Sequence, residues 1–231
     1  MSRTPIRRTP TTLRASTNMN FKPSVKRITA PTSSQIADFA TLTVRAMEGN
    51  DAASAMFGGD DSLSEEFFTA MIRATLLEGE VYVVEDEEAK TATLALWFRA
   101  PNRMFGSEAQ RARGFNDFYE KLSPETKDWW TQTYTPTMTK WRRVFYTPEE
   151  EARTWYCSLI VTDPARQNQG FATLFMDEFY KNVRKGDDLL SLATTTDHNV
   201  AMYLSWGFKE RGRITLESPI NTFPVVWLAK E

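Results

Sequence analysis

The chain is poor in cysteine and histidine. It has one of each among its 231 residues, Cys157 and His198. One cysteine cannot form an internal disulfide, and the two residues are too few to ligate a structural zinc. We therefore expect a reducing compartment and no bound metal. We interpret Cys157 as a small core residue rather than a nucleophile. For His198, a helix start or the surface is favoured over a general base.

Long apolar runs are also absent, so we expect neither a transmembrane helix nor a membrane partner. Apolar residues make up 41% of the chain and charged residues 25%, which is ordinary for a globular protein. A chain of 231 residues can bury one good core. We expect one domain over residues 20–231, present as a monomer or a homodimer.

Acidic residues are missing from the first 37 positions, which carry seven arginines and lysines. We interpret residues 1–19 as a disordered basic tail. The alternative is a mitochondrial transit peptide, since such segments are rich in arginine and poor in acids. We expect a cytoplasmic protein, with mitochondrial import as the alternative.

The rest of the chain, which we call the body, contains 21 basic and 30 acidic residues and therefore has a net charge of −9. This charge disfavours nucleic-acid binding and is compatible with a cationic amine as a ligand. We therefore expect no nucleic-acid partner.

Apolar periodicity predicts alternating strands and helices. A charged turn at 85–88 separates two strands of a hairpin, and we expect it to be exposed. The predicted strands cover 22–28, 80–84, 91–98, 154–162, 189–194 and 225–228, and the first two helices cover 35–47 and 62–77.

Residues 99–152 contain ten aromatic side chains, too many for a linker. Helices are predicted over 108–122 and 124–134, with Ser123 as a cap and Pro124 in the first turn. One interpretation is that these aromatics extend the core. The other is that the segment forms a wall over a ligand pocket, and both can hold together.

The clearest motif runs from Leu159 to Ala172. A buried strand ends at Asp163-Pro164, a polar turn with Gly170 follows, and an amphipathic helix begins. Free N–H groups at the helix N-terminus are suited to a phosphate or pyrophosphate. Within the turn, the pattern Gln167-x-x-Gly170-x-Ala172 resembles the acetyl-CoA signature of the GNAT-type N-acetyltransferase superfamily.

A second motif follows in the order that this superfamily has. The strand 189–194 is followed by a short helix with Asn199 and Tyr203, and then by Gly207-Phe208. The resemblance covers residues 153–230 well and 20–98 loosely, and the sequence looks most like that of fungal members of the superfamily. It implies an α/β (α+β) acyl-CoA N-acyltransferase fold. Its sheet would be mixed and mostly antiparallel, with six or seven strands splayed at the centre after Leu192 and flanked by helices.

The resemblance also implies an activity: transfer of acetyl from the co-substrate acetyl-CoA to a primary amine by direct attack. A small molecule is the first choice of acceptor, and a protein lysine or N-terminus is the alternative. Tyr203 would be the catalytic acid that protonates the thiolate; the other interpretation is that its ring only packs. The implied cofactor-binding residues are Ile160, Val161, Thr162, Gln167, Asn168, Gln169, Gly170, Phe171, Ala172, Thr173, Asn199 and Tyr203.

No general base can be assigned from the sequence. The strand 154–162 offers Tyr156 and Ser158 but no acid, which leaves acids of the segment 99–152, acids of the loop 48–61, or a water chain. The turn departs from the commonest signature at Asn168 and Gln169, where a glycine and a basic residue are frequent. Arg166 could compensate for the missing positive charge. The rival interpretation is a non-catalytic acyl-CoA-binding module.

Overall fold

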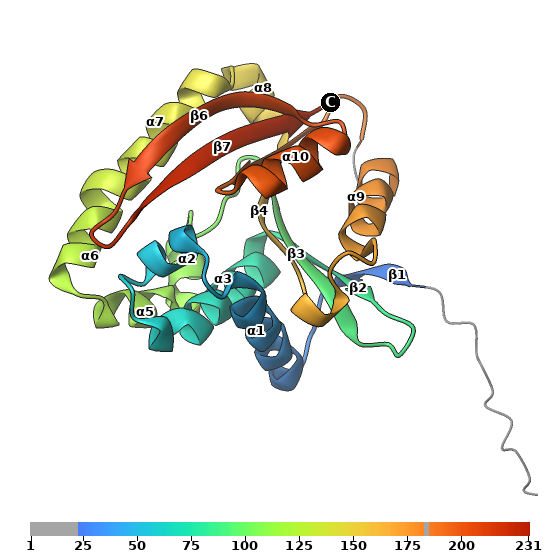
Figure 1. Ribbon diagram of the computed structural model, residues 1–231, viewed down its shortest axis with the longest axis horizontal. Helices are drawn as coiled ribbons and strands as arrows, with labels where there is room; N and C mark the ends of the chain where they lie inside the picture. Colours follow the sequence, from blue (N-terminus) through green and yellow to red (C-terminus); the bar gives the residue numbers. More distant parts are fainter. Residues whose placement is uncertain (1–22, 183–184) are drawn as a thin grey trace, which may run out of the picture.

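A seven-stranded sheet is the centre of the computed structural model, which describes residues 23–182 and 185–231 (Figure 1). The spatial order is β1-β2-β3-β4-β5-β7-β6. The strands are β1 (Ser24–Ile28), β2 (Glu80–Glu85), β3 (Thr91–Arg99), β4 (Thr154–Thr162), β5 (Leu189–Thr194), β6 (Lys209–Glu217) and β7 (Thr222–Lys230). β4 and β5 pair in parallel and the other neighbours are antiparallel, so the predicted fold class is confirmed. The tail 1–19 lies outside the described residues.

β4 and β5 pair over a short length and then separate. Their Cα partners run from Thr154 with Leu189 to Cys157 with Leu192. Beyond that point β4 follows β3 to Thr162, while β5 follows β7. The predicted splay after Leu192 is therefore confirmed. It leaves one edge of β4 open beyond Cys157.

Helices cover both faces of the sheet. On β2, Val81 and Val83 join the core under α1 and α3, while Tyr82 and Val84 pack on the α9 side. This alternation explains a strand that is apolar at successive positions. The helices outside the segment 100–152 are α1 (Ser33–Met47), α2 (Asp51–Met56), α3 (Ser64–Glu78), α9 (Phe171–Asn182) and α10 (Asp197–Ser205), with short turns η1 (Asp61–Leu63) and η4 (Pro164–Arg166).

Residues 100–152 form a helical insertion between β3 and β4. The first predicted helix is observed over 108–121, with a bend at Gly114. Ser123 Oγ accepts from the Thr126 N–H, and Pro124 stands in the first turn, as predicted. The elements are α4 (Glu108–Gln110), η2 (Arg111–Phe115), α5 (Asn116–Lys121), α6 (Pro124–Asp128), η3 (Trp129–Tyr134), α7 (Thr135–Phe145) and α8 (Pro148–Ala152).

The second helix of the insertion is longer than predicted. It continues to Phe145 instead of ending at Tyr134. The wide π-helical turn η3 precedes Pro136, which stands in the first turn of α7. At such a junction the missing proline N–H costs little, so the helix passes the proline.

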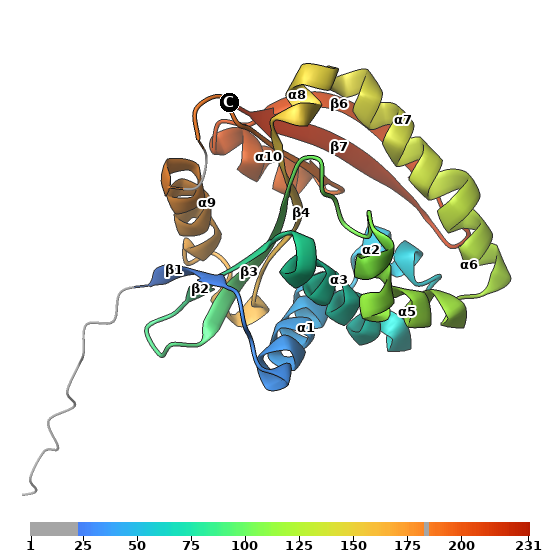
Figure 2. The ribbon, with the colours of Figure 1, turned by 180° about the vertical axis from the view of Figure 1, so that it is seen from behind.

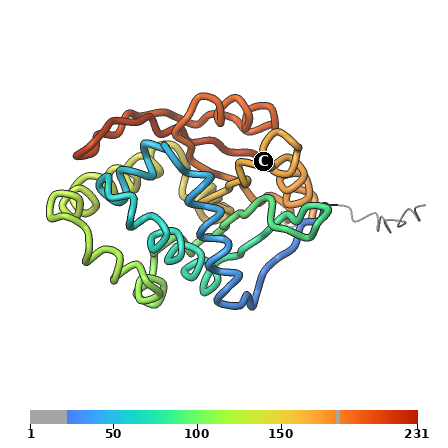
Figure 3. Tube along the Cα trace, turned by 60° about the horizontal axis from the view of Figure 1, so that its bottom comes forward, coloured from blue at the N-terminus to red at the C-terminus, as the bar shows by residue number. Residues whose placement is uncertain are grey.

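The insertion packs on the hairpin of β6 and β7, as the yellow-green and red segments show (Figures 2 and 3). Trp129 Nε1 donates to the Glu217 carbonyl at 2.7 Å, and the Tyr146 hydroxyl donates to the Leu228 carbonyl at 3.3 Å. β6 itself is missing from our predicted strands. It is a largely exposed edge strand, so no buried period-two pattern marks it.

We expect Gly212→Ala to lower the free energy of unfolding by about 1–3 kcal/mol, the usual cost of overpacking. A Cβ on Gly212 would overlap the ring of Phe145, the last residue of α7, which packs between Trp141 and Trp227. Urea denaturation measures the change. Phe145→Ala removes the obstructing ring, so the double variant should be more stable than the two single losses predict. Unchanged stability of Gly212→Ala would show that α7 is not fixed on β6.

Candidate active site

The turn that joins β4 to α9 presents a row of free backbone N–H groups. Leu174 N–H donates to the Gly170 carbonyl, which starts the helix. Within the described chain, no hydrogen bond from the backbone N–H groups of residues 167–173 is found. Asn168 and Gly170 have φ of +60° and +84°, values that asparagine and glycine tolerate best. The turn can therefore receive an anion.

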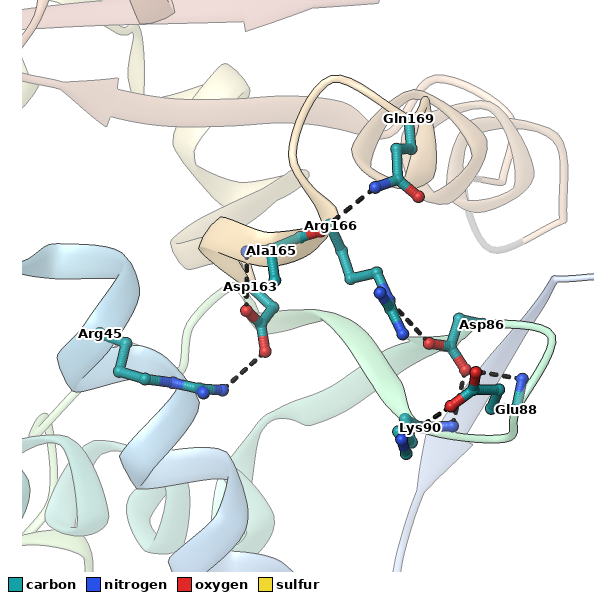
Figure 4. Close-up of polar contacts among 8 residues, drawn as sticks. All are labelled: Arg45, Asp86, Glu88, Lys90, Asp163, Ala165, Arg166 and Gln169. Atoms are coloured by element: carbon teal, nitrogen blue, oxygen red, sulfur yellow. Dashed lines mark hydrogen bonds and ion pairs between the residues drawn. The ribbon is translucent and has the colours of Figure 1, made fainter.

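Two ion pairs hold this turn from either side (Figure 4). Asp163 accepts from the Ala165 N–H and pairs with Arg45 of α1 at 2.6 Å. Arg166 pairs with Asp86 of the β2–β3 turn at 2.8 Å. The turn is thus fastened to α1 and to the hairpin.

One expectation about this region is wrong. The charged turn 85–88 is not wholly exposed, because Asp86 is only 4% exposed and faces Arg166. Arg166 binds Asp86 through Nε, and whether its guanidinium also compensates for the missing charge at a phosphate stays a prediction. The contact joins segments 80 residues apart, which no local pattern reveals.

Asp86 carries a carboxylate that its surroundings keep ionised. Burial opposes the charged form, but N–H groups of Lys90 and Glu88 and the Arg166 guanidinium together lower the pKa of this carboxyl. Because the pKa of Asp86 is lower in the folded state, its carboxylate stabilises the fold at pH values above about 4, the pKa in the unfolded chain. This stabilisation is lost as the pH falls through the folded-state pKa.

We expect Asp86→Asn to destabilise the protein by about 2 kcal/mol at pH 7, and to lower Tm by about 4–8 °C. The difference in Tm between the wild type and the variant should narrow as the pH falls below about 4, where the wild-type carboxylate takes up a proton. Thermal unfolding followed by circular dichroism over a pH series measures both. Glu88→Gln, at an exposed carboxylate of the same turn, is the control and should leave Tm unchanged. An equal effect of the two substitutions would contradict the role of Asp86.

The side chains of the turn lie back on the protein. Gln167 Nε2 donates to the Thr162 carbonyl at 3.3 Å, and Gln169 Nε2 donates to the Ala165 carbonyl at 3.2 Å. A Cβ placed on Gly170 would meet no atom of the described residues within 4 Å. The space over the backbone N–H groups is open, and Phe171, Ala172 and Thr173 form the first turn of α9 behind it.

The open edge of β4 is formed by particular residues. Asp163 N–H donates to the Ala92 carbonyl on β3 at 2.8 Å. Because bonded pairs alternate along an antiparallel ladder, Val161 also faces β3, whereas Ile160 and Thr162 direct their polar groups to the open edge. Val161, another predicted cofactor residue, directs its main-chain groups to β3 and not to that edge. Its side chain is buried in the core.

A cleft of about 1200 Å³ opens where β4 and β5 separate. It brings together Ile160, Asn199 and Tyr203 of the predicted site, while the turn 167–173 lies beyond the end of β4 and outside the cleft lining. Ser158 is a bulge residue opposite Leu96 and Trp97, and its Oγ is buried without a hydrogen bond to any described residue. Sequence patterns had not assigned Ser158 a function, since a bulge depends on the partner strand.

Tyr203 lines this cleft. The side chain is 5% exposed, its ring packs against Trp206 and Phe208, and no partner of the hydroxyl is found in the described chain. Burial raises the pKa of Tyr203, and neighbouring Cys157 and Tyr156 raise it further. The hydroxyl therefore keeps its proton at neutral pH.

Cys157 and His198 match their predicted structural interpretations. Cys157 is buried, its Sγ donates to the Leu159 carbonyl at 3.4 Å, and burial raises the pKa of the thiol. A protonated thiol is a poor nucleophile. His198 stands in the first turn of α10 and is exposed, away from the cleft lining.

Among the acids of the described residues, Glu151 alone lines the cleft, and Arg142 binds it at 2.6 Å. The acids of the loop 48–61 do not line the cleft, although Asn50 of that segment does. The same segment contains α2, which sequence patterns had missed. No group of three potential metal ligands occurs in the described residues. Their helices include none with the length and apolarity to span a bilayer.

Neither a protein-family model nor a curated protein matches this sequence. Solved structures do match. A histone acetyltransferase HPA2-related protein from Corynebacterium glutamicum shares 16% identity at a TM-score of 0.56, over 90% of this chain and 96% of that one. A putative GNAT acetyltransferase from Desulfovibrio desulfuricans shares 11% identity at a TM-score of 0.52, over 91% and 99%. The chain has the GNAT acetyltransferase fold.

The GNAT fold does not decide the reaction. The C-terminal condensation domain of Ebony, solved with beta-alanyl-dopamine, matches at a TM-score of 0.63 and 12% identity, over 91% of this chain and 99% of that domain. At such identities only the architecture is shared, so the chemistry must be argued from the residues of this GNAT fold.

Proposed function

We propose that the protein is an acetyl-CoA-dependent N-acetyltransferase that acts on a primary amine. One observation carries the proposal: the open edge of β4 leads from a turn of free N–H groups to a cleft that Tyr203 lines. A ligand with an anionic end and an extended arm fits that path. The GNAT fold supports the choice of acetyl-CoA.

The turn would hold the pyrophosphate. N–H groups of residues 167–173 and the positive end of α9 attract phosphate oxygens. Ile160 and Thr162 would bind the pantetheine arm through their main-chain groups, as a neighbouring strand would. The Asn199 side chain stands on the same face of α10 as Tyr203, one turn earlier, and would bind the arm from the other side.

The chemistry requires a neutral amine, a polarised carbonyl and a proton for the leaving thiolate. The amine nitrogen attacks the thioester carbonyl carbon, the carbon–sulfur bond breaks, and the Tyr203 hydroxyl protonates the sulfur. The amine loses its proton to water or to a carboxylate, and Glu151 is the cleft acid available for that task. Direct attack is favoured because the Cys157 thiol is buried and protonated.

A small-molecule acceptor is favoured, because the insertion walls the cleft with apolar side chains. Five methionines line it, and aromatic rings of the insertion lie beside them. A protein lysine or N-terminus is the alternative acceptor. A non-catalytic acyl-CoA-binding module is the alternative function, since the one cleft carboxylate is already paired with Arg142.

The test combines calorimetry with acetyl-CoA and an assay of free thiol released over a panel of primary amines. Saturable binding together with amine-dependent thiol release supports the enzyme. Tight binding with no release from any amine favours the non-catalytic module. No binding of acetyl-CoA or coenzyme A rejects both.

A further inference from the structure

The cleft contains more positive than negative charge. Among the described residues that line it, arginine is the only cationic type, with Arg103, Arg111 and Arg142, and Glu151 is the only acid. This arrangement is the reverse of the acidic body of the chain. The acidic body is compatible with a cationic amine acceptor, but the cleft lining adds no negative charge to attract one.

Two of the three guanidinium groups have partners. Arg142 Nε binds Glu151 at 2.6 Å. Arg111 binds Glu108 at 2.8 Å and also donates to the Phe105 carbonyl. For Arg103, no ion pair or hydrogen bond of the guanidinium is found in the part of the chain that the structure describes.

The backbone fixes the position of Arg103 in the loop between β3 and α4. Gly106 N–H donates to the Arg103 carbonyl at 3.1 Å, and a Cβ on Gly106 would press on the Arg103 side chain. Arg103 is an exposed residue at the edge of the cleft. Partial burial and nearby Arg142 lower the pKa of Arg103, nearby Glu151 raises it, and an arginine stays protonated at neutral pH. Arg103 thus brings to the cleft a positive charge that no hydrogen bond or ion pair engages in the described part of the chain.

We propose, on the basis of the proposed function, that the acceptor amine carries a carboxylate or phosphate group, which Arg103 binds in the cleft. The methionine and aromatic lining fits an apolar body between that group and the amine. The arrangement also assists the chemistry. The excess of guanidinium groups over carboxylates at the cleft disfavours the ammonium form of a bound amine, and so favours the neutral form that attacks.

Matched acceptors test the proposal. Phenylalanine and 2-phenylethylamine differ only by a carboxylate, and O-phosphoethanolamine and ethanolamine differ only by a phosphate. We expect the acid-bearing member of at least one pair to have the higher kcat/KM, by about 10-fold or more. Preference for one pair identifies which anion the site takes. A decarboxylated or dephosphorylated amine that is acetylated equally well in both pairs would overturn the proposal.

Arg103→Gln should reduce kcat/KM for the preferred acidic acceptor by about 10-fold or more, mainly through KM. It should change the uncharged partner less than about 2-fold, and Arg103→Lys should restore part of the loss. Arg113→Gln is the control, since Arg113 is an exposed arginine of the same insertion outside the cleft lining. An equal loss on both members of a pair would reject a role in anion binding.

Product binding separates this inference from the proposed function. Thermal shifts with N-acetylphenylalanine and with N-acetyl-2-phenylethylamine, in the presence of coenzyme A, require no turnover. For the phosphate pair, thermal shifts are measured in the same way with the N-acetylated products of O-phosphoethanolamine and of ethanolamine. A larger shift for the acidic product, lost in Arg103→Gln, supports the anion site even if no thiol is released. Equal shifts for both members in both arms would overturn the anion site, whereas failed thiol release alone counts against the enzyme.

Discussion

Gly170→Trp is expected to raise the Kd for acetyl-CoA by about 100-fold or more. The φ of +84° at this position strains any residue with a Cβ, by about 1–2 kcal/mol. The larger effect comes from the indole, which would fill the open space over the N–H groups of the turn. Losing two charge-assisted hydrogen bonds to phosphate is enough for a 100-fold change, and isothermal titration calorimetry measures it.

The control for this prediction is Gly186→Trp. Gly186 also has a positive φ, of +56°, and no atom of the described residues lies within 4 Å of an added Cβ. It lies beyond the other end of α9, so it shares the strain without touching the turn. We expect it to bind acetyl-CoA like the wild type. Normal binding by Gly170→Trp would mean that the pyrophosphate lies elsewhere.

Tyr203→Phe is expected to lower kcat by about 100-fold, within the range for loss of a general acid. The Kd for acetyl-CoA should change less than about 2-fold, because the ring keeps its contacts with Trp206 and Phe208. Only the hydroxyl is lost. Steady-state kinetics with saturating amine, together with calorimetry, separates the two effects.

Tyr156→Phe is the matched control for the acid. Tyr156 also lines the cleft, close enough to raise the pKa of Tyr203, and burial raises its own pKa. We expect the Tyr156 variant to retain most of its kcat. If Tyr203→Phe keeps its kcat and Tyr156→Phe loses it, Tyr156 is the general acid. If both variants keep their kcat, water protonates the thiolate.

Much of the site was accessible from local sequence. The pattern from Leu159 to Ala172 predicted a strand, a polar turn and a helix, and the structure has all three. Such features depend on neighbouring residues. An Asp-Pro step ends a strand, a glycine accepts positive φ, and an apolar stripe buries one helix face.

Other features were missed because distant segments create them. Asp86 looked like part of a solvated turn until Arg166, far along the chain, covered it. β6 is an edge strand specified by pairing with β7, and the electrostatic surroundings of Arg103 depend on which charged residues the insertion brings near. Local propensity carries no information about such partners.

The amino-acid order alone predicted the strand, the polar turn that can hold an anion and the helix after it, because short-range sterics and periodicity encode them. The fold class and the role of Tyr203 were implied by the resemblance to the GNAT superfamily. Tertiary structure decided which edge of β4 stays open, what fastens the turn, and the sign of the charge inside the cleft. These depend on pairing and burial between residues far apart in the chain, where contact geometry sets the electrostatics.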